Sequence, residues 1–325
     1  MEIRQLRYFV AVVESGSLSR ASSILHVVQS ALSQQMMQLE QELGTALLLR
    51  SVRGVLTTDA GAVLYRHAQA ILKQIDNARA SVAGADQAVR GPVSMGIPTS
   101  TGLSTAATIL ERVRQAHPAV QLSVVEAPSG LLVQMLASGG LDFSFLYHTN
   151  FLHGFETERL LSEPLCLLAP AGWPVAPSPN QSGTVPLDAL ARTPLMLPRR
   201  PNATRMLLEE ACKARGLSMQ IVAEADSLDT LGACVAAGIG GTVLTAANIA
   251  RLASQGLAVQ GPYRLEPRIE RDVVLARSRE FPRTQAAELT YALARATTVD
   301  LLLAGKLPGA RLASADPVAD AAARS

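Results

Sequence analysis

The stretch SLSRASSILHVVQSALSQQMMQLEQELG, residues 17–44, decides the fold of the N-terminal region. It contains a short helical pattern over 18–25, a turn, and a second helical pattern over 29–43 that Gly44 ends. Within the second pattern, apolar residues recur every three or four positions and therefore predict one buried stripe. The residues of this stripe are Leu32, Met36, Leu39 and Leu43.

The other face of the second helix carries neutral hydrogen-bonding side chains, where a solubilising face would carry Lys and Glu. A helix-turn-helix uses such a division, because its second helix enters the major groove and presents short donors and acceptors to base edges. The alternative is a solvated helix that happens to be rich in Gln, and the helix alone does not decide between them. The residues of this face are Gln29, Ser30, Ser33, Gln34 and Gln38.

The flanking segments favour nucleic-acid binding. Residues 4–14 place apolar side chains on one helical face and stop at Ser15-Gly16, which predicts a further helix before the pair. After Gly44, two short apolar runs surround Arg50 and Arg53, a pattern typical of a hairpin wing. Arginines at the tip of a wing suit contacts with backbone phosphates.

In this order, residues 6–61, from LRYFVAVVESGS to RSVRGVLTTDAG, resemble the winged helix-turn-helix of LysR-type transcriptional regulators. The motifs RGVLTTDAG, RGPVSMG and SLDTL most closely resemble those of regulators similar to the nitrogen assimilation control regulator. The resemblance implies that Gln29, Ser33 and Gln34 face the bases, and that the other polar residues lie near the backbone. The predicted DNA-binding residues are Arg20, Gln29, Ser30, Ser33, Gln34, Gln38, Arg50 and Arg53.

Three positions depart from the family pattern. The family often has Ser or Thr where this chain has Val28, Pro where it has Ser30, and Arg where it has Gln34. Losing the capping hydroxyl at Val28 should cost about 1 kcal/mol of helix stability. Losing the Arg at Gln34 should make DNA binding less dependent on salt and alter the base preference.

Residues 58–91 predict one long connecting helix, since Gly61 and Gly84 are its only breakers. Its apolar residues form a seam at steps of four and three, which favours packing against another helix. The alternative is packing on the chain's own domain. In the resembled family this linker helix builds the dimer, and the resemblance implies the same for Leu64, Ala68, Ile71, Ile75, Ala78 and Val82.

The remaining residues alternate strand and helix patterns, which predicts an α/β unit. Residues 170–186 and 261–268 are expected to be surface or hinge segments. The predicted strands are 93–97, 122–126, 142–147, 165–169, 195–197, 221–224, 242–244 and 273–276, and the predicted helices are 103–116, 131–138, 202–215, 227–237 and 283–298.

The segments GGLDFSFLY, LMLPRRPN and DSLDTLGACVAAGIGGTVLT resemble the effector domain of the same family, a periplasmic-binding-protein-like pair of subdomains. The expected fold class is therefore an N-terminal all-α winged helix-turn-helix with a long linker helix, followed by an α/β effector domain of two subdomains. The expected domains are 1–58 for DNA binding, 59–90 for the linker, 92–303 for the effector domain (subdomain I 92–164 and 269–303, subdomain II 165–268), and 304–325 as a disordered tail.

A small carboxylate or similar anion is the expected effector, bound in a cleft between the subdomains. Hydroxyls and backbone N–H groups at a helix N-terminus favour an anion through the local dipole. The alternative is that these hydroxyls only cap helices and that the regulator is constitutive. The predicted effector-binding residues are Thr99, Ser100, Thr101, Ser129, Tyr147, His148, Arg200, Asn202 and Thr245, although the family usually has Leu-Pro where this chain has Leu244-Thr245.

Composition narrows the function classes. The chain is 48% hydrophobic and 17% charged, which indicates a globular protein, and its net charge of +2 requires any nucleic-acid site to be local. Its three Cys residues and five His residues show no metal-ligand spacing, and GIGGT fails the dinucleotide fingerprint, so an α/β enzyme is disfavoured. An exported solute-binding protein would not need the reading head, and an adaptor would not need the wing arginines.

The sequence therefore predicts a cytoplasmic, ligand-responsive transcription factor without cofactor, metal or membrane segment. The expected partners are double-stranded DNA, further copies of the chain as a dimer and then a tetramer, the anionic effector, and RNA polymerase as a further candidate.

Overall fold

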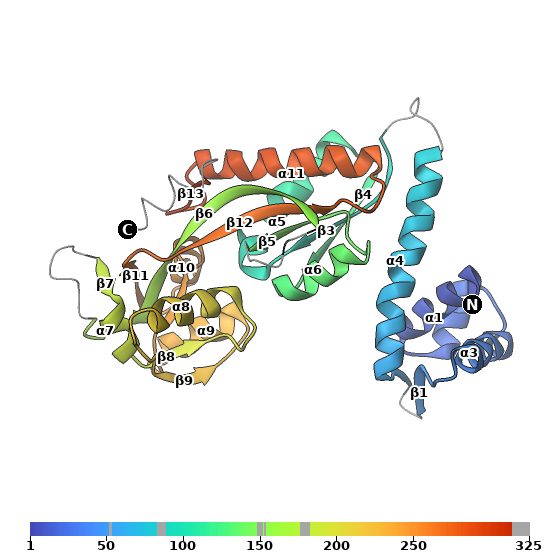
Figure 1. The fold of residues 1–325 in the computed structure, drawn as a ribbon, viewed down its shortest axis with the longest axis horizontal. Coiled ribbons are helices and arrows are strands. Elements are labelled where there is room, and N and C mark those ends of the chain that lie inside the picture. The colour runs from blue at the N-terminus through green and yellow to red at the C-terminus, as the bar shows by residue number, and fades with distance from the viewer. Residues whose placement is uncertain (52–53, 83–88, 148–151, 153, 176–182, 314–325) are drawn as a thin grey trace.

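The computed structural model describes residues 1–51, 54–82, 89–147, 152, 154–175 and 183–313 of the chain. It consists of a small helical unit at the N-terminus, a long helix α4 (Asp59–Val82) and an elongated α/β unit, with α4 between the two units (Figure 1). Within the part of the chain that is described, no helix is both long and apolar enough to pass through a bilayer.

The N-terminal unit consists of α1 (Ile3–Ser15), α2 (Leu18–Leu25), α3 (Gln29–Leu43) and the hairpin β1 (Leu48–Ser51) with β2 (Gly54–Thr57). The bounds of α2 and α3 agree with the sequence prediction. Gly16 and Gly44 end α1 and α3 in the left-handed conformation, which glycine adopts without strain. The core of this unit includes the fully buried Phe9, Val12, Ala21, Leu32, Met36 and Leu39.

Leu43 was expected in the same buried stripe, but its side chain is exposed. It is the last residue of α3, and the chain turns back at Gly44. Leu47 and Leu48, which follow the turn, are buried in the core instead.

Helix α4 packs its N-terminal half against the N-terminal unit, because Leu64, Ala68 and Leu72 belong to that core. Gly61 is required at the closest approach. A Cβ built on Gly61 would lie 2.0 Å from the carbonyl oxygen of Leu47, a distance that no side chain can occupy. The helix and the segment that leads into the wing are therefore held together as one body.

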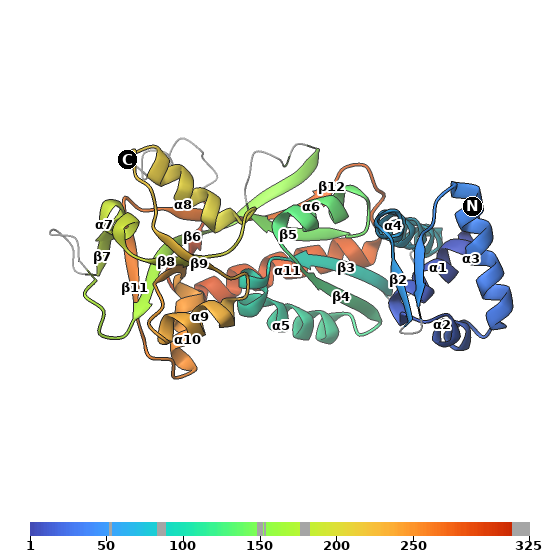
Figure 2. The same cartoon turned by 90° about the horizontal axis from the view of Figure 1, so that it is seen from below.

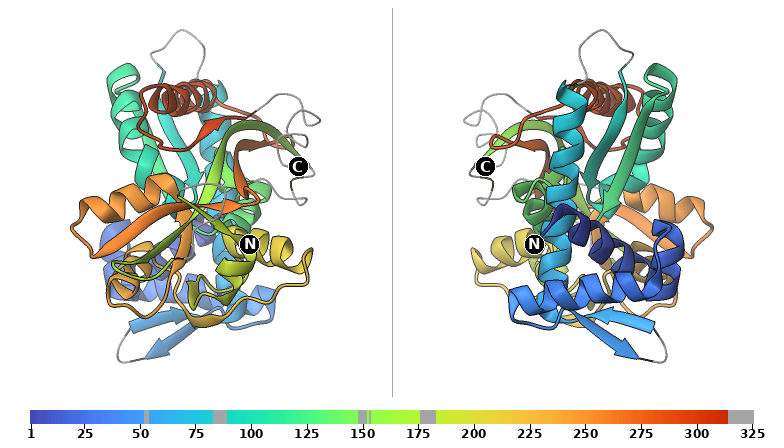
Figure 3. Two further views of the ribbon diagram at one scale, coloured as in Figure 1. Left: turned by 90° about the vertical axis from the view of Figure 1, so that its left-hand side faces the viewer. Right: turned by 90° about the vertical axis from the view of Figure 1, so that its right-hand side faces the viewer.

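The first core of the α/β unit lies on a sheet in the order β4-β3-β5-β12-β6. Strands β3, β4 and β5 are parallel, and β12 runs antiparallel to both β5 and β6. Viewed along the long axis of the molecule, α11 runs end-on at the top (Figure 3). The elements are β3 (Gly91–Ile97), α5 (Thr99–Ala116), β4 (Val120–Glu126), α6 (Ser129–Ala137), β5 (Phe143–Tyr147), β6 (Phe155–Pro170), β12 (Glu270–Ser278) and α11 (Gln285–Leu303).

Two further cores lie at the other end of the unit, and β6 connects them to the first. Residues 155–164 of β6 pair with β12, whereas residues 165–170 pair with β10 and β11. The change of partners falls between Pro164 and Leu165. The elements of this end are β7 (Thr184–Pro186), α7 (Leu187–Arg192), β8 (Leu195–Leu197), α8 (Ala203–Lys213), β9 (Ile221–Glu224), α9 (Leu228–Ala236), β10 (Thr242–Thr245), α10 (Ala246–Ser254) and β11 (Val259–Glu266).

Residues 261–268 were expected to form a surface or hinge segment; five of the eight are exposed at the surface, as expected, but residues 261–266 also belong to strand β11. The strand pairs with β6, and its register shifts between Gln260 and Tyr263. Gly261 and Pro262 lie in that irregularity, where a proline without an N–H is tolerated. Because Gly and Pro are uncommon inside strands, these two residues kept the strand from being predicted. Helix α10 and the first ten residues of β6 were also missed.

The predicted disorder from residue 304 onward is wrong for residues 304–313. Leu307 is buried in the first core, and β13 (Arg311–Leu312) pairs antiparallel with β6. The backbone N–H of Ala313 donates to the carbonyl of Leu160 at 3.0 Å. A two-residue strand is too short to show a periodic pattern, so composition alone suggested disorder. Residues 314–325 lie outside the described part of the chain.

Candidate nucleic-acid interface and effector site

Helix α3 lies at the end of the molecule that is remote from the α/β unit (Figure 2). On its polar face, Gln29, Ser30, Gln34 and Gln38 are exposed and Ser33 is half-buried. The helix begins after Val28, which is 71% exposed and makes no side-chain capping bond. The face therefore presents neutral donors and acceptors to solvent at the free end of the molecule.

The wing contributes a guanidinium group to the same face. Arg50 on β1 donates through Nη1 to Ser33 Oγ at 2.9 Å, and its Nη2 lies 3.9 Å from Glu40 Oε2. Glu40 Oε1 accepts hydrogen bonds from the backbone N–H groups of Leu47 and Leu48, at 2.8 and 3.0 Å. Glu40 thus fixes the start of the wing on α3, a role that the sequence reading missed.

Arg20 and Arg53 were also predicted to bind DNA. Arg20 is exposed on α2, whose N-terminus Ser17 caps by accepting from the backbone N–H of Arg20. Arg53 lies outside the described residues.

The predicted dimer seam divides into two parts. Ala68 is fully buried and Leu64 is half-buried, both in the N-terminal core. Ile71 is 39% exposed, Ile75 is half-buried and Ala78 is exposed, whereas the side chain of Val82 lies outside the description. Ile71, Ile75 and Ala78 line a pocket where α4 faces the α/β unit, together with His67, Ala70, Gln74, Ser138 and Phe281.

Polar contacts join α4 to the loop between α6 and β5. Lys73 Nζ lies 3.0 Å from Asp142 Oδ2 and donates to the carbonyl of Gly140 at 3.2 Å. Gln74 donates to the carbonyl of Gly139 at 3.3 Å. Burial lowers the pKa of Lys73 below its ordinary value, against the opposing effect of the Asp142 carboxylate. Lys73 is not a position of the predicted seam, and no sequence pattern indicated this junction.

Three of the predicted effector-binding residues come together at the N-terminus of α5. The hydroxyl of Tyr147 hydrogen bonds with Ser100 Oγ and lies 3.3 Å from Thr101 Oγ1. Thr99, which begins the helix, is exposed. The hydroxyls expected to meet an anion therefore contact one another.

Arg271 on β12, which the sequence reading missed, is the charged centre of this cluster. Its Nη1 donates to Ser100 Oγ and to Thr204 Oγ1 on α8, both at 3.3 Å. Its Nε and Nη2 donate to Glu163 Oε2 on β6, at 3.2 and 2.6 Å. The guanidinium carbon lies 3.9 Å from the centre of the Tyr147 ring.

Burial acts to lower the pKa of Arg271, but its interactions with Tyr147 and the Glu163 carboxylate outweigh burial and raise the pKa above its ordinary value. Arg271 therefore carries its charge while it is only 4% exposed.

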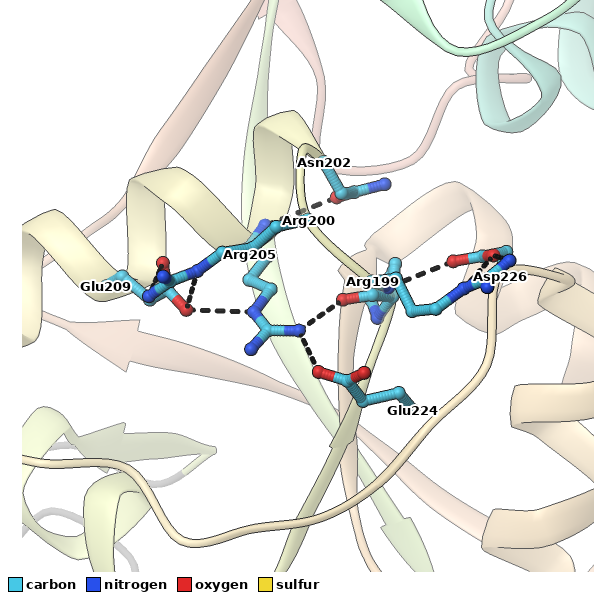
Figure 4. Close-up of polar contacts among 8 residues, drawn as sticks. Arg199, Arg200, Asn202, Arg205, Glu209, Glu224 and Asp226 are labelled. Atoms are coloured by element: carbon cyan, nitrogen blue, oxygen red, sulfur yellow. Dashed lines mark hydrogen bonds and ion pairs between the residues drawn. The ribbon is translucent and has the colours of Figure 1, made fainter.

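The remaining predicted effector residues are not part of this cluster. Figure 4 shows Arg200 directed to Glu209, whose Oε2 lies 2.8 Å from Arg200 Nη2. Asn202 caps α8 by accepting from the backbone N–H of Arg205 at 3.2 Å. Burial would raise the pKa of Glu209, but the hydrogen bonds from Arg200 and Arg205 lower it below its ordinary value. Arg200 therefore forms its ion pair within the same end of the α/β unit, with Glu209 on α8.

Thr245 and Ser129 carry the two remaining hydroxyls that were predicted to bind the effector. Thr245 caps α10 by accepting from the backbone N–H of Asn248 at 3.4 Å. Ser129 Oγ is buried and makes no hydrogen bond within the described residues. His148 lies outside them.

A helix-turn-helix with a hairpin wing, joined by a long helix to an α/β unit with cores at both ends, defines a DNA-binding transcriptional regulator with an effector domain. Residues 3–62 match the bacterial regulatory helix-turn-helix proteins of the lysR family, and residues 86–298 match the LysR substrate binding domain. The chain belongs to the LysR family of transcriptional regulators. It is a regulator and not an enzyme.

Among curated relatives, the nitrogen assimilation regulatory protein nac of Klebsiella aerogenes is 40% identical over 245 residues, which cover 75% of this chain and 78% of that protein. The nac protein of Escherichia coli is 38% identical over the same shares. A probable hydrogen peroxide-inducible genes activator of Mycobacterium leprae is 34% identical over 74% of this chain and 77% of that protein.

Solved structures share the fold. A full-length OxyR variant from Pseudomonas aeruginosa aligns with a TM-score of 0.64 at 24% identity, over 91% of this chain and 95% of that one. CbnR, a LysR family transcriptional regulator, aligns with a TM-score of 0.62 at 24% identity, over 91% of this chain and 99% of that one.

Proposed function

We propose that the chain reads DNA sequence through the neutral polar face of α3 and holds the backbone with its arginines. The observation that carries this proposal is the division of α3 into two faces. Leu32, Met36 and Leu39 are buried, whereas Gln29 and Gln34 are exposed, and no residue of α3 between them is charged. Amide groups of this kind pair with adenine edges in the major groove.

The test compares a cognate duplex, selected from random DNA by the chain itself, with a scrambled duplex. Gln34→Ala should lose about 1 to 3 kcal/mol of binding free energy on the cognate duplex and little on the scrambled one. Gln41→Ala is the matched control, because Gln41 is an exposed glutamine at the C-terminal end of the same helix, and recognition helices read bases with their N-terminal residues. Equal losses on both duplexes would exclude direct readout by Gln34.

We further propose that the chain acts in the cytoplasm as a homodimer that assembles through the exposed part of α4, and that two dimers form a tetramer. Ile71, Ile75 and Ala78 carry this proposal. Ile71→Glu should separate the dimer, because it places a charge in an apolar contact. Asp76→Asn, a charge change at an exposed position on a different face of the helix, should leave the oligomer intact. Light scattering that shows the parent's oligomer for Ile71→Glu would assign the stripe to packing against the chain's own pocket at Phe281.

The cores at the two ends of the α/β unit are proposed to act as subdomains, one formed by 92–164 with 269–303 and the other by 165–268. RNA polymerase is a proposed partner of the promoter-bound dimer. A small anionic effector at Ser100 and Thr101 is one proposal for this unit. The alternative, a regulator that works without an effector, is favoured by one observation: the guanidinium of Arg271 already holds the carboxylate of Glu163.

A thermal-shift screen separates these two proposals. An effector should raise the melting temperature of the parent, and the shift should vanish in a Ser100→Ala, Arg271→Met variant. If no anionic metabolite stabilises the parent, the result supports a regulator that works without an effector.

A response to peroxide, suggested by the names of some relatives, is disfavoured by the cysteines. The thiolate is the reactive form of cysteine. Burial raises the pKa of Cys166 to about 11 and also raises that of Cys212. Two of the three thiols are therefore kept in their unreactive form at neutral pH.

A further inference from the structure

The strongest unexplained feature of the α/β unit is a pair of opposite charges buried at its middle. Arg271 and Glu163 are directly opposite each other in the antiparallel pairing of β12 with β6. They are 4% and 6% exposed. Removing two charges from water is costly, so a buried pair of this kind calls for a reason beyond stability.

The pair lies where the two ends of the unit meet. Glu163 precedes the point at which β6 changes partners, between Pro164 and Leu165. Ser100, on the side of the first core, and Thr204, on the side of the second, both accept hydrogen bonds from the same Nη1 of Arg271. The guanidinium thus bonds to both sides at this point, and Glu163 neutralises it.

The hydrogen bonds of Arg271 leave little for an incoming anion. A guanidinium has five N–H groups. Four donor contacts are already made, two to Glu163 and two to the hydroxyls of Ser100 and Thr204. A second carboxylate would lie beside Glu163, and two buried carboxylates that share one cation repel each other.

A second carboxylate of the chain also lies near the N-terminus of α5. A Cβ built on Gly102 would be 3.2 Å from Glu126 Oε1, so this carboxylate lies against the first turn of the helix. Negative charge at that end is favoured by the helix dipole. The anion position predicted at the N-terminus of α5 and the cation Arg271 are therefore each served by a carboxylate of the chain, from β4 and β6 respectively.

We propose that Glu163 is the built-in anion of the effector domain, and that its carboxylate occupies the place on Arg271 that a small carboxylate effector would take. This inference rests on the proposed role of the α/β unit as the effector domain and deepens it. The chain then holds both ends of the unit in the bridged arrangement without a ligand. Removal of the Glu163 carboxylate turns the site into a receptor for small carboxylates.

The test is chemical rescue of the full chain by acetate. Glu163→Ala removes the Cγ atom and the carboxyl group, which together have the composition of acetate. The melting temperature of each variant is measured in sodium acetate and in sodium chloride at equal ionic strength. At an acetate concentration ten times its Kd, the ratio of folded to unfolded Glu163→Ala should rise about 11-fold over chloride. The melting temperature should rise by about 3 to 6 °C.

Three controls define the result. The parent should show no acetate effect, because Glu163 fills the site, and Glu163→Ala with Arg271→Met should show none, because the cation is gone. Glu224→Ala is the matched carboxylate deletion: Glu224 pairs with Arg205, which keeps Glu209 as a second partner (Figure 4). Acetate should therefore leave this variant unchanged.

Several outcomes overturn the inference. Acetate that stabilises the parent through Arg271 would show that the site accepts an external anion beside Glu163. A folded Glu163→Ala that ignores acetate would show that the site is not a receptor. If Glu163→Ala does not fold in chloride, it is refolded in acetate, and failure to recover more folded protein there also overturns the inference. Binding of the parent to its cognate duplex, measured in parallel, tests the proposed DNA-reading function separately.

Discussion

The polar face of α3 and the cluster around Arg271 are opposite solutions to the placement of polar groups. On α3 the groups are neutral, exposed and few of them bond to one another. Around Arg271 they are charged or hydroxylic, buried, and bonded mainly to one another. An unsatisfied polar group is costly only when water cannot reach it, so the first surface can wait for a partner and the second must satisfy itself within the chain. In the proposed functions, the first is a site for recognition and the second sets the form of the domain.

The largest effect should come from breaking the buried pair. Arg271→Leu leaves the Glu163 carboxylate buried without its partner and should lower the free energy of unfolding by about 3 to 5 kcal/mol. Urea unfolding at pH 7 measures this. Arg271→Leu combined with Glu163→Leu should recover most of the loss, because no charge remains buried. A double variant as unstable as the single one would show that packing, and not charge, accounts for the loss.

Removal of an exposed arginine from the wing should weaken DNA binding and leave the stability of the fold unchanged. Arg50→Ala should weaken binding to cognate and scrambled DNA alike, by about 1.5 to 3 kcal/mol. The slope of log K against log salt should fall in magnitude by about one, since one phosphate contact is lost. The free energy of unfolding should stay within about 0.5 kcal/mol of the parent. Loss on the cognate duplex alone would place Arg50 among the base-reading residues.

A gain of stability is expected where the reading helix begins. Val28→Ser supplies the missing cap hydroxyl to the first N–H groups of α3 and should raise the free energy of unfolding by up to about 1 kcal/mol. Val28 is exposed, so its removal opens no cavity. Thermal melting measures the gain, and a flat or lower melting temperature would contradict it.

The smallest effect concerns a half-buried ionic network on the α/β unit. Hydrogen bonds from Arg277 and then from Arg283 lower the pKa of Glu156 from 4.5 to about 2. A carboxyl group with a lowered folded-state pKa stabilises the fold above its ordinary pKa, and this contribution disappears as the pH falls from 4.5 towards 2. Glu156→Gln should therefore make unfolding less dependent on pH in this interval. Because the Glu156 side chain is 43% exposed, an unchanged pH profile would mean that solvent screens the network.

Local signals explain why the DNA-reading unit could be predicted so well from the sequence. The bounds of α2 and α3 follow from apolar periodicity, the Ser17 cap and Gly44, all of which act within a few residues. The Arg271–Glu163 pair joins residues that are 108 positions apart, so no local pattern contains it. The residues 270–272, Glu-Arg-Asp, resemble a solvated strand end, yet all three are buried. Burial of a charge depends on its partner, and the partner is set by strand register.

The pairing of β13 with β6 makes the effector domain depend on residues that leave the ribosome long after the DNA-reading unit. The core of the DNA-reading unit draws on residues from Leu6 to Leu72, which are synthesised earlier. Leu307 in the first core of the α/β unit and Arg311 on β13 arrive more than two hundred residues later. A chain that terminates early, before Leu307, would therefore carry a complete α3 and an unfinished effector domain. Such truncated products would compete with intact chains for the same operators.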